Sequence, residues 1–175
     1  MYWFFKCLRQ YFDFKGRARR KEYWMFYLWA LIIEVVIYGL SLLLGGGLPG
    51  IGFDESVPPE LMPRNVGMGM FFTGLITLYG FAILIPQLAV TVRRLHDIGK
   101  SGWLLLLIYL LIFAGIGLMT YYSVTMLANG PETSMVPFWI GLSIIIAVTI
   151  WFIALMVKKG DVGRNKYGED PKSTF

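Results

Sequence analysis

The sequence has a single cysteine and a single histidine, and each scarcity excludes a class of site. One thiol, Cys7, cannot form an intrachain disulfide, and its place in a segment expected inside the cell predicts that it is reduced. One histidine, His96, without a cluster of metal-ligating residues gives no recognisable metal site. We therefore expect no metal and no other cofactor. The sequence also shows no arrangement of nucleophile and base, so a noncatalytic protein is favoured over an enzyme.

Charged residues are also scarce, at 15% of the chain, whereas 57% of the residues are apolar and the mean hydropathy is positive. This composition is atypical of a soluble domain. The net charge of +5 and the pI near 9.4 could suggest nucleic-acid binding in a soluble protein. Here the basic residues lie at the ends of apolar runs, so membrane topology and anionic lipid explain them first. We expect no nucleic-acid partner.

Four long apolar runs account for this composition, at residues 23–44, 68–92, 103–122 and 137–157. Each has about the 20 residues that an α-helix needs to cross a hydrocarbon core of roughly 30 Å. The first run is too long for the apolar core of a signal peptide, so we predict that it is a retained span. The sequence therefore predicts an all-α membrane protein, a four-transmembrane-helix bundle in which residues 1–175 form a single membrane domain.

The basic residues are distributed unevenly between the two ends of these runs. All but one of the sixteen lysines and arginines lie before the first run, between the second and the third, or after the fourth. The exception, Arg64, lies in one of the other two connections. Because basic residues near span ends resist translocation, this asymmetry predicts that the three basic segments and both termini are cytoplasmic.

Three further segments flank the predicted spans. Residues 1–21 begin with apolar and polar side chains at helical spacing, which predicts an interfacial amphipathic helix followed by a basic segment. Residues 158–175 contain regularly placed turn formers and predict a short structured cytoplasmic tail. The outer connection of residues 45–65 is rich in glycine and proline and is predicted to be irregular. Its length leaves open whether it is a functional lid or a mobile excursion.

Glu34 lies near the middle of the first run, where a charged carboxylate costs about 3 kcal/mol. We expect it to face the bundle and to be hydrogen-bonded, protonated or both. The candidate partners are Thr77, Tyr79, Tyr109 and Thr149. The alternative is a proton or cation site, although no second acid or base lies at mid-depth to form a relay. Pro86 removes a backbone hydrogen bond and is expected to release a carbonyl toward Gln87 or a neighbour.

The connection RRLHDIGKSGW, between the second and third runs, is rich in polar groups. It contains, in order, Arg93, Arg94, His96, Asp97, Lys100 and Ser101. A glycine turn that opens a helix beside cations would hold a phosphate or a lipid headgroup. The alternative is structural, with the basic residues fixing the topology, Ser101 capping the third helix and His96 pairing locally with Asp97. The upstream glycine of a Walker motif is missing, so ATP binding is not expected.

Three motifs together resemble the YhaH/YhaI-type family of small bacterial inner-membrane proteins, catalogued as a domain of unknown function. They are FKGRARRKEYW (residues 14–24), RRLHDIGKSGW (residues 93–103) and GRNKYGEDP (residues 163–171). The resemblance covers nearly the whole chain. It implies a multi-pass protein of the bacterial inner membrane with no established activity.

The predicted topology places all three motifs on the same cytoplasmic side, where they could form one polar site. Its residues would be Arg17, Arg19, Arg20, Arg93, Arg94, His96, Asp97, Lys100, Ser101, Arg164, Asn165 and Asp170. Pairing of Asp97 or Asp170 with some of the arginines would leave a net basic pocket, suited to an anionic lipid headgroup or a phosphorylated ligand. The alternative is an ion-paired cap that joins helix ends.

The sequence leaves three functions open. The first is a noncatalytic membrane protein that binds anionic lipid, a phosphorylated ligand or a partner, which includes another membrane protein or a second copy of this chain. The second is a small ion or proton channel or transporter that uses Glu34 and needs a polar route that the runs scarcely supply. The third is a membrane enzyme acting on a lipid-linked substrate, with His96 beside Asp97 as a general base.

Overall fold

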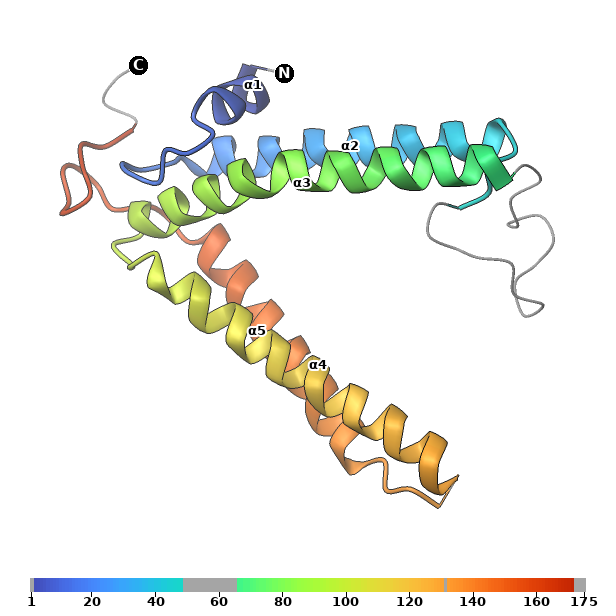
Figure 1. The fold of residues 1–175 in the computed structure, drawn as a ribbon. Helices are drawn as coiled ribbons and strands as arrows, with labels where there is room; N and C mark the ends of the chain where they lie inside the picture. Colours follow the sequence, from blue (N-terminus) through green and yellow to red (C-terminus); the bar gives the residue numbers. More distant parts are fainter. Residues whose placement is uncertain (1, 49–65, 131, 172–175) are drawn as a thin grey trace. The chain divides into compact units, whose positions relative to one another are not determined.

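The computed structural model describes residues 2–48, 66–130 and 132–171, and within them every regular element is a helix (Figure 1). The helices are α1 (Tyr2–Arg9), α2 (Arg20–Leu43), α3 (Val66–Asp97), α4 (Trp103–Asn129) and α5 (Val136–Val157). Helices α2 to α5 are long and apolar enough to cross a membrane. The all-α class with four long apolar helices is confirmed and is consistent with the predicted four-helix membrane bundle. Most of the predicted outer loop and the last four residues of the predicted tail lie outside the described residues.

The four apolar helices begin at or shortly before the predicted runs, but two of them end later than predicted. Helix α3 continues past Val92 to Asp97, and α4 continues past Tyr122 to Asn129. An apolar run reflects the depth of the hydrocarbon, whereas backbone hydrogen bonds decide where a helix ends. The extension of α3 places the polar residues that follow Val92 on a regular helical turn.

The chain divides into two compact units, which are described separately. The first unit comprises Met1–Asp13 and Lys21–Val90, and the second comprises Phe14–Arg20 and Thr91–Phe175. Helix α3 contributes to both. The expectation that the whole chain forms one membrane domain stays a prediction.

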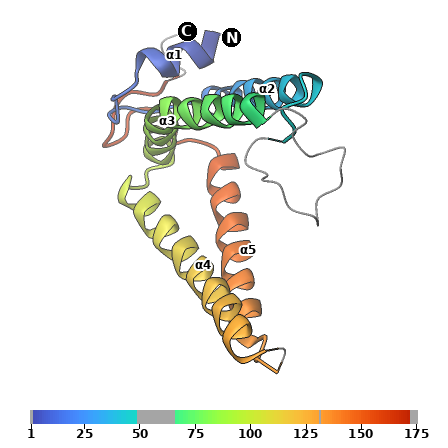
Figure 2. The ribbon, with the colours of Figure 1, turned by 45° about the vertical axis from the view of Figure 1, so that its right-hand side comes forward.

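In the first unit, α2 and α3 lie side by side and run in opposite directions, as both ribbon views show (Figures 1 and 2). Phe26 of α2 and Phe72 and Ile83 of α3 are buried apolar side chains of this unit. Helix α1 packs on α2, since the ring of Phe4 stacks on Phe26 with centroids 5.4 Å apart. The predicted N-terminal amphipathic helix is therefore present, and its place in a membrane interface stays a prediction.

In the second unit, α4 and α5 pack against each other as antiparallel neighbours. The helices approach closely where Gly115 faces Gly141. A Cβ atom on Gly141 would lie 2.5 Å from the carbonyl oxygen of Gly115, and one on Gly115 would lie 2.9 Å from the carbonyl oxygen of Gly141. Small residues at such a crossing allow close packing of helices in lipid, where packing rather than the hydrophobic effect drives association.

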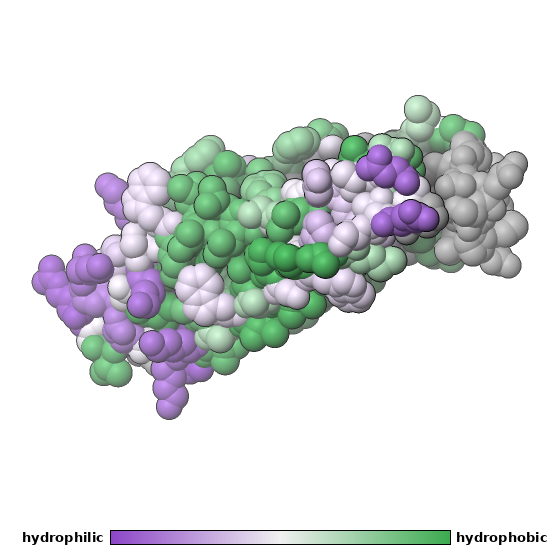
Figure 3. All heavy atoms as spheres, turned by 90° about the horizontal axis from the view of Figure 1, so that it is seen from below, coloured by the Kyte–Doolittle hydropathy of each residue, from purple (hydrophilic) through white to green (hydrophobic). Residues whose placement is uncertain are grey.

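Apolar side chains cover much of the outside of these helices. Leu110, Phe113 and Ile150, for example, are large apolar residues that are exposed in the structure. Figure 3 shows one face of the molecule, on which hydrophobic residues cover a broad area and many hydrophilic residues gather on the left of the view. Soluble monomers rarely expose contiguous apolar surface of this kind. The surface therefore suits contact with lipid.

Candidate functional site

Arg17, Arg94 and Asp97 form a buried group in the second unit, which we call the Asp97 cluster. Nε and Nη2 of Arg17 each lie 3.1 Å from Oδ1 of Asp97, and Nη1 of Arg94 is bonded to Oδ2. The side chains are 1%, 0% and 7% exposed, in that order. Arg94 and Asp97 share a face of α3 because they are three residues apart. Arg17 reaches them from the segment before α2.

The remaining N–H groups of the two arginines donate to backbone carbonyls around the end of α5. The accepting carbonyls belong to Met156, Lys158, Asp161 and Gly163. Two guanidiniums and one carboxylate leave a net positive charge, and burial of that charge is costly unless hydrogen bonds satisfy it. The carbonyl dipoles supply those bonds. The cluster thus joins the segment before α2, the end of α3 and the C-terminal tail.

Backbone contacts fix the same three segments. The N–H of Ala18 donates to the carbonyl of Arg93 at 3.0 Å, and the N–H of Asp161 donates to the carbonyl of Asp97 at 2.8 Å. Gly160 lies directly against Asp97, and a Cβ atom at this position would overlap the carboxylate. A residue without a side chain is therefore required where the tail passes the cluster.

His96 is next to Asp97 in sequence but bonds elsewhere. Its Nδ1 lies 3.2 Å from the carbonyl oxygen of Gly16, and because a carbonyl oxygen can only accept, Nδ1 carries the proton. The ring stacks on Tyr167 with centroids 3.9 Å apart and planes inclined by 8°. Asn165 donates from Nδ2 to the backbone carbonyl of His96 at 3.0 Å. The predicted local pair of His96 with Asp97 is wrong, because successive side chains of a helix do not face each other.

Two other arginines of the first motif, Arg19 and Arg20, also bond to backbone carbonyls of the second unit. Arg19 donates from Nε to the carbonyl of Pro171 at 2.6 Å, and Arg20 donates from Nη1 to the carbonyl of Val157 at 3.2 Å. Arg93 is buried at the end of α3. Arg19 thus bonds to the tail and Arg20 to the last residue of α5.

The remaining predicted site residues lie in less enclosed places. Lys100, Ser101 and Arg164 are exposed, whereas Asp170 is half-buried and accepts a backbone N–H from the tail at 3.3 Å. The N-cap of α4 is Gly102, and Ser101, one residue earlier, accepts the backbone N–H of Trp103 at its Oγ, 3.4 Å away. Of the buried arginines, Arg17 and Arg94 pair with Asp97, which is consistent with the alternative of an ion-paired cap. The exposed cations beside this cap include Lys100, Lys158, Lys159 and Lys166.

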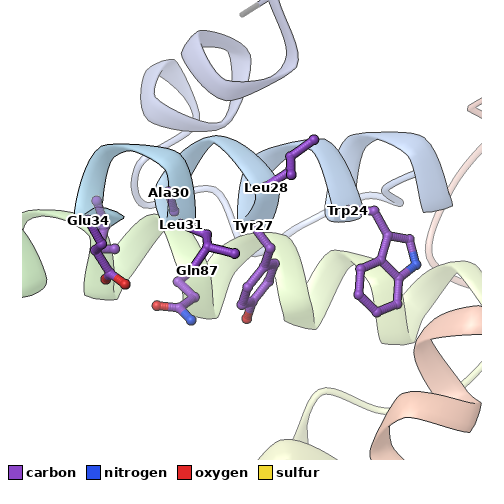
Figure 4. Close-up of a pocket in the computed structure, with 8 residues that line it drawn as sticks. Trp24, Tyr27, Leu28, Ala30, Leu31, Glu34 and Gln87 are labelled. Carbon is purple, nitrogen blue, oxygen red and sulfur yellow. The ribbon is translucent and has the colours of Figure 1, made fainter. Parts of the chain in front are cut away.

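The intramembrane residues lie in the first unit. Glu34 and Gln87 line a cavity of about 390 Å³ whose other walls are largely apolar (Figure 4). Tyr79 donates its hydroxyl proton to the carbonyl of Ala30 at 3.1 Å, and Thr77 donates to a carbonyl one turn earlier in its own helix. Both hydroxyl protons are therefore directed to the backbone and not to Glu34. The expectation that these residues are partners of Glu34 stays a prediction.

The sequence interpretation missed the buried acid of the first unit. Glu22, which is 1% exposed, lies 2.8 Å from the Nζ of Lys6 and 3.9 Å from the Sγ of Cys7. These contacts fix α1 against the first turn of α2. An acid in the first turn of a helix is favoured by the helix dipole alone, so its presence there did not signal a partner.

A second contact, at the carbonyl that Pro86 leaves without a helical partner, was predicted from the sequence only in part. Because proline has no N–H, the carbonyl of Ala82, four residues earlier, loses its helical partner. The hydroxyl of Tyr11 donates to this oxygen at 2.9 Å. The predicted carbonyl is therefore bonded by a neighbour, and that neighbour comes from the segment after α1.

Known proteins similar to this chain share its membrane character. A family described as "Protein of unknown function (DUF805)" matches residues 11–169. "Inner membrane protein YhaH" of Escherichia coli (strain K12) is 39% identical over 115 residues, which are 66% of this chain and 78% of that protein. "Inner membrane protein YhaI" of the same strain is 31% identical over 175 aligned residues, which cover 98% of this chain and 97% of the relative. No solved structure matches the chain significantly.

Proposed function

Since the chain belongs to the family described as Protein of unknown function (DUF805), we propose that this integral inner-membrane protein binds anionic phospholipid through its cytoplasmic face. The proposed role is noncatalytic. The cytoplasmic face is the part of the second unit formed by residues 14–20, 91–102 and 158–171. This orientation, with both termini in the cytoplasm, is supported by the uneven distribution of lysines and arginines.

The observation that carries the proposal is the division of the cations of the second unit into two kinds. Arg17 and Arg94 are buried and direct their donors to Asp97 and to backbone carbonyls. They are therefore engaged inside the protein. The exposed cations beside them, by contrast, are mainly lysines, whose compact ammonium groups remain in water.

Exposed lysines at the end of a membrane span suit the phosphates of an anionic leaflet. Each lysine near such a surface contributes roughly 1 kcal/mol to binding. Lys158 and Lys159 directly follow α5, and Lys100 directly precedes the turn into α4. The Asp97 cluster holds the backbone that carries Lys158, because Arg94 donates to its carbonyl. The buried arginines thus support a basic surface whose own side chains contact the lipid.

The test is retention of phosphatidylglycerol by purified protein, measured by native mass spectrometry. Replacement of Lys100, Lys158, Lys159 and Lys166 together by glutamine should weaken binding by up to roughly 800-fold, since four lysines at roughly 1 kcal/mol each contribute about 4 kcal/mol. The matched control replaces the same four residues by arginine and should bind like wild type. Equal lipid retention by the glutamine variant and the control, with unchanged thermal transitions, would refute the proposal.

The orientation has its own test. Reporter fusions to each terminus should show activity typical of the cytoplasm. A periplasmic signal from either terminus would contradict the assigned face.

The cavity beside Glu34 supports a second candidate function, a small proton or cation channel or transporter. Its support is that Glu34 and Gln87, two of the few polar residues in the long apolar helices, line the same cavity. The replacement Glu34→Gln keeps the shape of the side chain and removes its charge. In proteoliposomes this variant should lose ion flux, and unchanged flux would remove the basis for this candidate.

A further inference from the structure

A cavity of about 460 Å³ lies beside His96 in the second unit. Its lining combines apolar side chains, including Val92, Trp103 and Leu106, with the polar residues His96 and Ser101. Trp103 and Leu106 belong to the first turn of α4, and both are exposed. The cavity therefore has one polar part and one apolar part that continues along a predicted span.

The imidazole of His96 is held in a defined orientation at this cavity. Nδ1 is engaged with the carbonyl of Gly16, and the ring stacks on Tyr167. The other nitrogen, Nε2, faces Gly102 in the cavity wall, since a Cβ atom on Gly102 would lie 3.6 Å from it. With the proton on Nδ1, the neutral ring presents a lone pair at Nε2. The cavity thus contains a positioned hydrogen-bond acceptor.

We propose that this cavity is the headgroup subsite for an anionic phospholipid that carries a headgroup hydroxyl, as phosphatidylglycerol does. The hydroxyl donates to Nε2 of His96, and an acyl chain lies along Trp103 and Leu106. Lys100 is exposed and immediately precedes Ser101, which lines the cavity, and in this proposal its ammonium pairs with the phosphate. This inference rests on the proposed function and specifies the class of lipid.

The acceptor makes the site selective among lipids of equal charge. A headgroup without a hydroxyl would cover Nε2 and leave it without a hydrogen bond. One such bond corresponds to a preference of roughly five-fold. The lysines, in contrast, act on the phosphate and do not distinguish two headgroups that bear the same charge.

The experiment compares phosphatidylglycerol with phosphatidylpropanol, an anionic lipid whose headgroup has the same carbon chain and no hydroxyl. Native mass spectrometry of the full-length protein measures retention of each lipid. Wild type should prefer phosphatidylglycerol by roughly five-fold. In His96→Asn the amide N–H can replace the Nδ1 donor toward Gly16, but nothing replaces Nε2. This variant should retain both lipids equally.

A second variant keeps the test independent of the stacking of His96 on Tyr167. Gly102→Ala adds a methyl group 3.6 Å from Nε2 and leaves the histidine in place, and the side chain of Val92, whose Cγ1 would lie 2.8 Å from the new Cβ atom, must shift to admit it. It should also lose the preference for phosphatidylglycerol. Thermal transitions of both variants, measured in detergent, show whether the fold is retained.

The outcomes separate this inference from the proposed function. Equal retention of the two lipids by wild type, or an unchanged preference in both His96→Asn and Gly102→Ala, would overturn the headgroup subsite. The four-lysine glutamine variant would still lose both lipids if the basic face binds anionic phospholipid. If that variant instead retained both lipids like wild type, the proposed function would fail and the inference with it.

Discussion

Each compact unit fixes a segment of the N-terminal region with one buried carboxylate, but the cations that meet it differ. In the first unit, Glu22 is 1% exposed and meets the ammonium of Lys6, whose side chain is 31% exposed. In the second unit, Asp97 lies between Arg17 and Arg94, whose side chains are 1% and 0% exposed. One pair thus remains partly in water, and the other group is enclosed.

The chemistry of the two cations explains the difference. An ammonium is a compact, strongly hydrated charge at the end of a flexible chain, whereas a guanidinium presents five donors in one plane. Arg17 and Arg94 therefore bond to Asp97 and still reach backbone carbonyls of the tail. Lys6 connects α1 with the start of α2. The guanidiniums connect three segments, so removal of their carboxylate should cost more.

The largest effect is expected from Asp97→Asn. This replacement leaves two buried guanidiniums without their counter-ion and should destabilise the second unit by about 3 kcal/mol or more. The tail should then separate from α3, so trypsin should cut after Lys158 and Lys159 faster than in wild type. A lowered thermal transition in detergent is the second measurement.

The matched control for this prediction is Glu169→Gln, which removes the same charge from an exposed acid of the tail. Glu169 lies 3.4 Å from Arg164, and the two side chains are 68% and 78% exposed. An exposed pair of this kind contributes little, so the change should stay below about 0.5 kcal/mol. Equal effects of the two substitutions would show that burial does not distinguish them.

A smaller effect is expected from Glu22→Gln, which keeps the shape of the side chain and removes the charge that Lys6 meets. The loss should be about 1 kcal/mol, since the pair is a charge-assisted hydrogen bond with one partly hydrated member. Cys7 reports this loss because it is fully buried beside Glu22. Its reaction with a thiol reagent should become roughly five-fold faster.

Lys6→Met tests the same contact from the other side. It leaves the buried carboxylate without its ammonium, so the labelling of Cys7 should accelerate at least as much as in Glu22→Gln. Labelling at the wild-type rate in both variants would show that this contact does not hold α1 on α2.

The long helices could be predicted from the sequence because hydropathy sums over about 20 residues and gives a strong signal. The pairing of side chains could not be predicted, because it depends on residues that are far apart in the chain. Arg17 and Asp97 are 80 positions apart, and nothing in either motif indicates which arginine meets the acid. At His96, adjacency in the sequence led to the wrong prediction of a pair with Asp97, because neighbouring side chains of a helix point to different sides.

At Pro86, likewise, one part of the contact could be predicted from the sequence and the other could not. The sequence predicts the free carbonyl, because the missing N–H of proline is a property of the residue itself. The partner, Tyr11, is 71 positions away from Ala82 and precedes the first predicted span. Its role becomes visible only when the chain is folded.

An effect smaller than that of Glu22→Gln is expected from the neutral hydrogen bond between Tyr11 and Ala82. Tyr11→Phe removes the hydroxyl that donates to Ala82 and should destabilise the first unit by about 0.6 kcal/mol, the average for hydrogen bonds between helices in a membrane. In the background Pro86→Ala, the restored backbone N–H can satisfy the same carbonyl. Tyr11→Phe should then have almost no effect, so the two substitutions should not be additive. The rate of Cys7 labelling in the four proteins of this cycle measures the coupling. Additive effects would mean that Tyr11 acts through packing and not through the carbonyl that Pro86 leaves free. Of the two polar contacts of the first unit, only the one between Lys6 and Glu22 would then stabilise it.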